Sequence, residues 1–143
     1  NLEKKLNEAV NETHRGLKKN GKVCASFRAD NIQNYISDWL FNRNTKVSGS
    51  PKFFHKMNLK KKEFLKLFSN RGFEVEHIYA VENMSFLYKI PFFRNKSQKL
   101  FKENDARAKG YNLSFSGNLL QKILMKFFKN QFCNVFVIIA KKI

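Results

Sequence analysis

The 143 residues of this chain are enough for one compact domain and too few for two ordinary ones. Hydrophobic residues make up 43% of the sequence, which argues against disorder along the whole chain, and no apolar run reaches the ~18 residues that a membrane-spanning helix needs. The formal net charge of +17 favours anionic partners such as nucleic acid.

The composition behind this charge indicates mutational bias more than selection for nucleic-acid binding. The cations are 22 Lys and only 6 Arg, and Asn (17) and Phe (16) are abundant together with Lys. All three have AT-rich codons, and selection for phosphate contacts would not enrich Asn or Phe. The charge attracts anionic surfaces whatever its origin. The chain starts with the charged segment Asn1 to Lys5, so we expect no signal peptide here. Because the first residue is not an initiator Met, we also expect the chain to begin inside a longer reading frame.

The first predicted elements are a helix and a buried strand. Apolar residues recur at helical spacing from Leu2 to about Lys18, and Asn20-Gly21 is typical of a helix end. The mostly apolar segment Lys22–Phe27 predicts a strand covered on both faces. Because Cys24 and Cys133 lack metal-ligand spacing, we expect both side chains to be buried in the protein core and the protein to lie in the reducing cytoplasm. A disulfide between the two residues is the alternative.

Two further helices and a strand are predicted next. Asp30 is expected to cap a helix over Asn31–Phe41. The apolar residues of that helix fall on one side: Ile32, Tyr35, Ile36, Trp39 and Leu40. After a polar loop, Asn58 is expected to cap a helix from Leu59 to about Asn70, and Phe73–Val81 predicts a strand.

The last third of the chain is predicted to end in its strongest strand. The aromatic segment Asn83–Phe93 is expected to be irregular or a short helix, and Lys96–Ala108 a polar helix. Gly117-Asn118 is expected to open a helix over Leu119–Lys129 with a wide apolar stripe. Phe132–Ala140, rich in Val and Ile, is the clearest strand. This order of elements is typical of an α/β layered protein.

Three stretches resemble class I S-adenosylmethionine-dependent methyltransferases of the Rossmann-like kind. Glu12–Val23 resembles the family's passage from a helix through Arg-x-Leu-Lys-x-Gly-Gly into the fifth strand, with Asn20 in place of the first Gly. Asn tolerates the same positive φ. Glu63–Val75 resembles the entry to the sixth strand, a helix followed by Gly-Phe-x-Val, and Asn134–Lys142 is similar to the seventh strand. The order and spacing of these three stretches, which together span nearly the whole chain, make the chain resemble the C-terminal half of such an enzyme.

The resemblance implies a sheet in which the last strand is central. In that family the seventh strand inserts antiparallel between the fifth and the sixth. We therefore expect residues 1–143 to form a single α/β domain, a partial Rossmann-like fold with a three-stranded mixed sheet and flanking helices. Phe132–Ala140 would lie in the middle, with Lys22–Phe27 and Phe73–Val81 outside it. Without a fourth strand, Lys22–Phe27 would be an unpaired edge.

The resemblance also implies S-adenosylmethionine as cofactor and methyl transfer to an O, N or C acceptor. The family binds this cofactor with a Gly-rich turn after its first strand and an acidic residue after its second, and no Gly-x-Gly occurs here. The cofactor is therefore expected to bind mainly to an N-terminal half outside this sequence, and the fragment alone to be inactive. Such enzymes work largely by positioning, so no catalytic cluster is required. The acceptor, a small or lipid-like molecule, is not fixed.

Five residues are candidates for the substrate site. Arg28 follows the first predicted strand, where ligands of open α/β sheets bind, and would meet an anionic substrate group or else be solvated. His55, in the loop before the Leu59 helix, would be a general base near neutral pH or an ordinary surface residue. Asn83, Phe86 and Tyr88 would line an apolar or planar substrate, or belong to a hydrophobic cluster packed under a loop.

Two non-enzymatic functions are the alternatives. One is a basic nucleic-acid-binding module that uses aromatic side chains for stacking, and the other a peripheral protein with Lys-rich helices on anionic lipid. Either would need cations and exposed aromatic side chains gathered on one face. The sequence spreads Lys over every predicted helix, so we expect no specific nucleic acid, no transmembrane segment and only weak attraction to anionic surfaces. It leaves the oligomeric state open.

Overall fold

The computed structural model describes residues 2–40, 58–98 and 110–143 and has an α/β architecture. The elements in chain order are α1 (Leu2–Gly16), β1 (Lys22–Arg28), α2 (Ile32–Leu40), α3 (Lys61–Ser69), β2 (Phe73–Val81), α4 (Ser85–Lys89), the 3-10 helix η1 (Pro91–Phe93), α6 (Phe115–Phe127), α7 (Lys129–Phe132) and β3 (Val135–Lys142). Contacts divide the chain into two compact units. We call them the sheet unit (Asn1–Asp30, Thr45–Val81 and Val135–Ile143) and the helical unit (Asn31–Asn44 and Glu82–Asn134).

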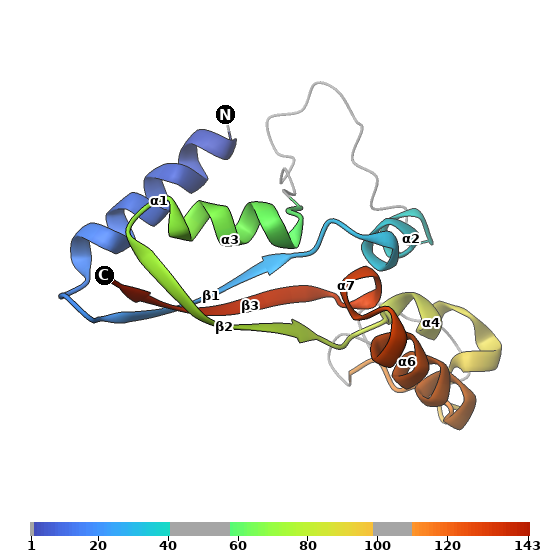
Figure 1. Ribbon diagram of the computed structural model, residues 1–143. Coiled ribbons are helices and arrows are strands. Elements are labelled where there is room, and N and C mark those ends of the chain that lie inside the picture. Colours follow the sequence, from blue (N-terminus) through green and yellow to red (C-terminus); the bar gives the residue numbers. More distant parts are fainter. Residues whose placement is uncertain (1, 41–57, 99–109) are drawn as a thin grey trace, which may run out of the picture. The chain divides into compact units, whose positions relative to one another are not determined.

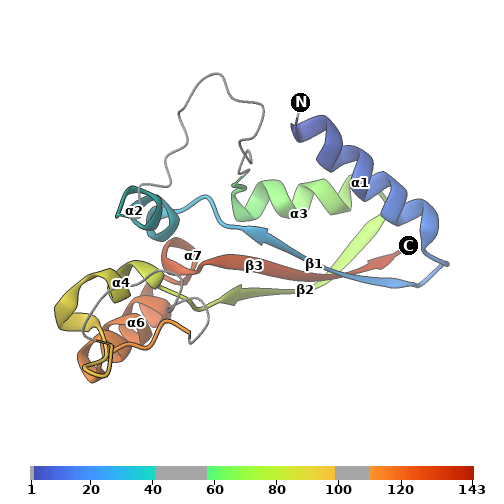
Figure 2. The same cartoon turned by 180° about the vertical axis from the view of Figure 1, so that it is seen from behind.

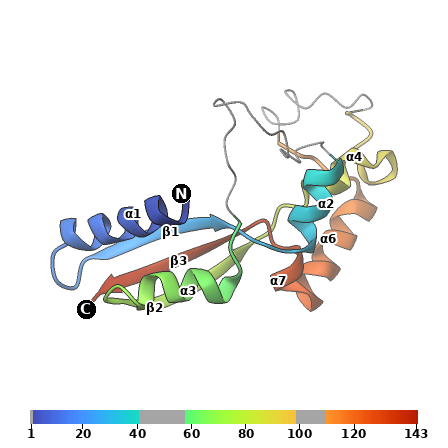
Figure 3. The same cartoon turned by 90° about the horizontal axis from the view of Figure 1, so that it is seen from above.

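The sheet unit has three strands in the order β1-β3-β2, so the last strand is central, as predicted (Figure 3). Both ladders are antiparallel; on β3, Ile139 pairs with Cys24 of β1 on one side and His77 of β2 on the other. The prediction of a mixed sheet is wrong for these strands. β1 and β2 do run in the same direction, but β3 separates them, so they form no parallel ladder.

The central strand begins at Val135, three residues later than predicted. The preceding residues Lys129–Phe132 form the short helix α7. The carbonyl groups of Cys133 and Asn134 do not enter a ladder, because they accept hydrogen bonds of 2.7 Å from the side chains of Asn31 and Asn34, respectively. Side-chain amides thus provide the hydrogen bonds for these two carbonyl groups, which a strand would have paired with its neighbours.

Helices α1 and α3 cover one face of the sheet (Figures 1 and 2). Phe64 and Phe68 of α3 and Phe73 of β2 form successive edge-to-face ring pairs, each with centroids 5.5 Å apart. Phe136 and Ile138 of β3 are buried as well. Each such side chain contributes roughly 1.5–3 kcal/mol on burial. This aromatic layer is the core of the sheet unit.

The opposite face of the sheet is open within the sheet unit. Lys22, Cys24 and Ser26 alternate with half-buried residues along β1, and all three are exposed. The predictions that this strand is covered on both faces and that Cys24 is buried are therefore wrong, whereas Cys133 is buried as expected. The reason is that α1 and α3 both pack on the same side, which gives β1 the alternation of a one-sided sheet.

The turn between α1 and β1 has the geometry that its sequence predicts. Asn20 has a positive φ of 64°. A Cβ atom on the next residue, Gly21, would lie 2.8 Å from the Lys18 carbonyl oxygen, so this residue must be glycine. The ammonium group of Lys142 on β3 donates to the carbonyl oxygens of His14 (2.6 Å) and Leu17 (2.8 Å). The Lys142 ammonium group therefore provides hydrogen-bond donors for carbonyl groups at the C-terminal end of α1.

Asn31, not Asp30, caps α2. The Asn31 side-chain oxygen accepts a hydrogen bond from the backbone amide of Asn34 at 3.0 Å. The Asp30 amide instead donates to the Leu59 carbonyl at 2.9 Å, in a parallel bridge between the residues that follow β1 and those that precede α3. Asp30 is therefore held by this hydrogen bond one residue before the cap.

The starts of α3 and α6 also differ from the prediction. The Lys60 amide donates to the Glu63 carboxylate at 2.8 Å, so α3 begins at Lys61 without a cap from Asn58. Ser114 caps α6 by accepting from the Gly117 amide at 3.2 Å, and the helix starts four residues before Leu119. Gly117 lies in the first turn of α6. A Cβ atom there would lie 2.6 Å from the Phe93 carbonyl oxygen, so the position requires glycine.

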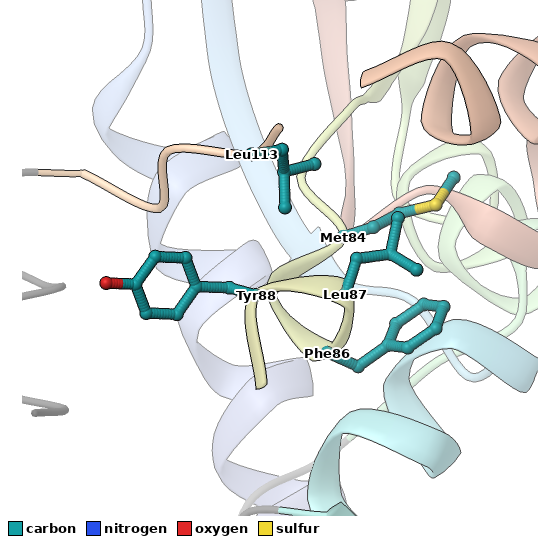
Figure 4. Close-up of a cluster of buried hydrophobic side chains, with 5 residues drawn as sticks. All are labelled: Met84, Phe86, Leu87, Tyr88 and Leu113. Carbon is teal, nitrogen blue, oxygen red and sulfur yellow. The ribbon is translucent and has the colours of Figure 1, made fainter. Parts of the chain in front are cut away.

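The core of the helical unit lies around α4, the short helix predicted as one possibility for the aromatic segment. Its buried residues are Met84, Phe86, Leu87, Tyr88 and Leu113 (Figure 4). Arg94 is buried beside Tyr88: its guanidinium lies 5.4 Å from the ring centroid and donates to the Tyr88 carbonyl at 2.8 Å. Of the helix predicted over Lys96–Ala108, residues 99–108 lie outside the described ranges, and 96–98 form a turn.

Helix α2 buries its polar side. Gln33 donates to the Asn83 carbonyl at 2.7 Å, and Ser37 shares a 3.1 Å hydrogen bond with Ser85. On the apolar side, which was expected to be buried, Tyr35 is 73% exposed and Trp39 is 63% exposed. The remaining apolar residues are Ile32, which is half exposed, and Ile36 and Leu40, which pack partly against the core cluster. Periodicity located the helix correctly but not the face that it buries.

Candidate functional site

A surface hollow of about 460 Å³ lies between α1 and α3 in the sheet unit, at the carboxyl end of β1. Its size falls within the ~300–1,000 Å³ of ligand pockets. The lining residues are Glu3, Leu6, Asn7, Asp30, Asn58, Leu59, Glu63, Lys66, Leu67, Asn70 and Arg71. The hollow therefore lies where open α/β sheets bind their ligands, beyond the carboxyl end of a strand.

A short bridge between two chain segments builds the end of the hollow nearest β1. Leu59 donates its amide to the Arg28 carbonyl at 3.2 Å and accepts from the Asp30 amide at 2.9 Å. Ala29, between these two partners, is fully buried. The bridge fixes the backbone on both sides and places Asp30 and Asn58 at the hollow's lining.

Arg28, a predicted substrate-site residue, lies next to this bridge. Its guanidinium donates to the Asn58 side-chain oxygen at 3.1 Å. Asn58 lines the hollow, whereas Arg28 does not. Arg28 therefore stands at the predicted end of β1 and orients Asn58; a direct contact with substrate stays a prediction.

Charged residues of both signs line the hollow. The carboxylates of Asp30 and Glu63 lie toward β1 and the start of α3, and Arg71 lies just beyond the end of α3. Arg71 donates to the Leu67 carbonyl at 2.9 Å and to the Asn7 side chain, which ties α3 to α1. Because Glu3 and Lys66 line the hollow as well, a ligand there would meet both hydrogen-bond acceptors and cationic donors.

The other predicted site residues are found elsewhere. His55 lies outside the described residues. Phe86 and Tyr88 are brought together in the core of the helical unit, and the Asn83 carbonyl accepts from Gln33. This placement matches the hydrophobic-cluster alternative for the aromatic segment. A substrate-binding role for these three residues stays a prediction.

Sequence reasoning missed Asn58, Glu63 and Arg71 as lining residues. The sequence predicts Asn58 only as a helix cap, and Glu63 and Arg71 only as members of the stretch that resembles the entry to the sixth strand. The available signal was their clustering around one helix: they precede, begin and follow α3. A polar residue at a helix boundary has a bland explanation, so pattern alone does not single it out.

The described residues do not fit a tight cofactor cradle. S-adenosylmethionine sites need glycine where the backbone approaches the cofactor. Gly21 and Gly72 serve turns, Gly117 packs on Phe93, and none of the glycines in the described ranges lines the hollow. Nor do residues 2–40, 58–98 and 110–143 contain a group of three His, Cys, Asp or Glu side chains able to hold a metal ion.

The open face of the sheet is not a basic platform. Its one ion pair within the described part of the chain joins Lys22 of β1 to Glu76 of β2 at 2.7 Å. The hydrogen bond from Lys22 lowers the pKa of Glu76, with smaller contributions from the charges of Lys22 and Lys141. His77 and Tyr79 stack with centroids 6.0 Å apart. Acidic residues thus offset the lysines beside the exposed rings, which weakens the nucleic-acid interpretation.

Comparison with known proteins gives no family: no protein-family model matches the sequence, and no curated protein is significantly similar to it. Among the helices that the structure describes, each is too short or too polar to cross a lipid bilayer.

Proposed function

We propose that this chain is the C-terminal part of the catalytic domain of a class I S-adenosylmethionine-dependent methyltransferase. The observation that carries the proposal is the position of β3, the last strand, between β1 and β2 and antiparallel to both. The helices α1 and α3, which precede β1 and β2, lie on one face of this sheet (Figure 1). The strand order is the one that the sequence resemblance implies.

In this proposal the hollow at the end of β1 forms part of the acceptor site. Asp30 and Glu63 would accept hydrogen bonds from a hydroxyl or amino group of the acceptor. Arg28 would act as a positioning residue through its hydrogen bond to Asn58. S-adenosylmethionine would supply the methyl group, and the residues described here do not hold it. Their contribution is therefore to bind and orient the acceptor.

The experiment is a pair of calorimetric titrations with S-adenosylmethionine. One uses the 143-residue chain, and the other uses the same chain joined to the residues encoded immediately upstream of it. We expect no measurable binding to the first protein and clear binding to the second. A folded extended protein that does not bind S-adenosylmethionine would refute the proposal.

A substitution in the hollow tests the acceptor site separately. In the extended protein, Asp30→Asn should leave cofactor binding unchanged and lower methyl transfer to a panel of hydroxyl and amine acceptors by about tenfold, which is one charged hydrogen bond. Lys62→Gln, on the exposed side of α3, is the matched control and should have no effect. Equal transfer by both variants would remove the hollow from the acceptor site.

A further inference from the structure

Helix α6 carries an exposed apolar row in the helical unit. The row consists of Phe115, Leu119, Ile123 and Phe127, whose exposed fractions are 85%, 49%, 44% and 68%. Residues four apart lie on one face of a helix, so these side chains form one continuous ridge. Phe115 and Phe127, at its ends, are twelve positions apart, so the ridge is about 18 Å long at a rise of 1.5 Å per residue.

The ridge is not used by the core of its own unit. The adjacent row of α6 provides that contact through Leu120 and Leu124, which pack partly against the core cluster. Gly117 on the same side allows close approach to Phe93. The helix therefore has one wide apolar surface, of which one side is partly buried in the core and the ridge is exposed.

Lysines line the ridge along one edge. Asn118, Lys122 and Lys126 form a second row at the same spacing of four residues, directly beside the first, and all three are exposed. The Lys126 ammonium lies 5.7 Å from the ring centroid of Phe127, which places the two rows in contact. The sequence contains no Asp or Glu after Asp105, so the cations of this surface have no acidic neighbours along the chain.

We propose that α6 binds the surface of an anionic lipid membrane and lies parallel to it. A helix with large apolar side chains beside lysines is suited to this role, because the rings enter the boundary between headgroups and acyl chains while the ammonium groups meet lipid phosphates. Exposed apolar side chains and cations gather on one face here, as a peripheral membrane protein requires. This inference is independent of the proposed methyltransferase function.

The test measures sedimentation of the full chain with vesicles of phosphatidylcholine alone or mixed with phosphatidylglycerol, at about 0.15 M ionic strength. We expect binding to the mixed vesicles to be at least tenfold stronger. The double variant Leu119→Ser/Ile123→Ser should reduce binding to the mixed vesicles by about tenfold or more, through lost apolar burial. Lys122→Gln/Lys126→Gln should reduce it by roughly fivefold for each lysine and leave the phosphatidylcholine result unchanged.

Matched variants distinguish the ridge from general stickiness. Ile32→Ser/Tyr35→Ser removes comparably exposed side chains from α2, and Lys60→Gln/Lys62→Gln removes the same charge from the start of α3. Both should bind vesicles as the unmodified chain does, and circular dichroism checks that every variant is folded. Equal vesicle binding by ridge variants and controls would overturn the proposal. So would a ridge that is needed only for self-association in sedimentation velocity, or for binding of single-stranded RNA.

Discussion

Gly72 and Gly110 have nearly the same backbone conformation but different surroundings. Their φ angles are +74° and +78°. A Cβ atom added at Gly72 would lie 2.8 Å from His14 Nε2, whereas one added at Gly110 would meet no atom of the described residues within 4 Å. Gly72→Ala should therefore lower the free energy of unfolding by about 2 kcal/mol or more, and Gly110→Ala by only about 1 kcal/mol. Urea denaturation measures both, and equal losses would contradict the packing described for the His14 ring.

Lys142 should contribute more to stability than its neighbour Lys141. Its ammonium group donates to two carbonyl oxygens at the end of α1, those of His14 and Leu17. Lys142→Met leaves these carbonyls without their donor, so the free energy of unfolding should fall by about 1–2 kcal/mol. Lys141→Met is the control and should change it by less than about 0.5 kcal/mol. A larger effect of the control in chemical denaturation would show that this cap is unimportant.

The ion pair between Lys22 and Glu76 should make stability depend on pH in acid. The Lys22 hydrogen bond lowers the pKa of Glu76 in the folded state below its usual value of 4.5. A lowered folded pKa stabilises the protein above the unfolded pKa, and this contribution is lost as the pH falls through the folded pKa. The melting temperature of the unmodified chain should therefore exceed that of Glu76→Gln near neutral pH, and the difference should vanish in acid.

A second cycle shows whether Lys22 is the cause. In the Lys22→Met background, Glu76→Gln should no longer change the melting temperature in a pH-dependent way, because the main partner of the carboxylate is gone. A pH-dependent difference that persists in full without Lys22 would assign the effect to other charges.

At the scale of elements, α2 shows how side-chain hydrogen bonds can override apolar periodicity. Asn34 donates to the Asn134 carbonyl at 2.7 Å and is buried, whereas Tyr35 is exposed. Asn34→Ala should therefore lower the free energy of unfolding by about 1–3 kcal/mol, and Tyr35→Ala by less than about 0.5 kcal/mol. A thermal or urea unfolding series in which the tyrosine substitution costs more would show that α2 buries its apolar side.

Most element types were predictable from the sequence, whereas several of their ends and buried faces were not. β2 has the predicted bounds because Phe73–Val81 follows a glycine with positive φ, a local signal. The start of β3 was missed because the carbonyls of Cys133 and Asn134 bond to Asn31 and Asn34, about a hundred residues away. No local pattern contains that information. The exposure of Cys24 was missed for the same kind of reason, since it depends on which face α1 and α3 cover.

At the scale of the whole molecule, the strand order was the most predictable property. The last strand is the most hydrophobic, and the central place in a sheet is the most buried, so composition and the family resemblance indicated the same order. Of the candidate site, only Arg28 and its neighbours could be placed in advance, because Arg28 ends β1. Asn58 joins them through the bridge between Ala29 and Leu59, a tertiary contact that the sequence does not encode in any spacing.

The position of β3 between the other two strands is what the methyltransferase proposal depends on, and nuclear Overhauser contacts in solution measure it directly. We expect backbone contacts from Ile139 to both Cys24 and His77, and none between Cys24 and His77. Backbone contacts that join β1 directly to β2, or that connect β3 with only one of them, would contradict the sheet and the function proposed from it.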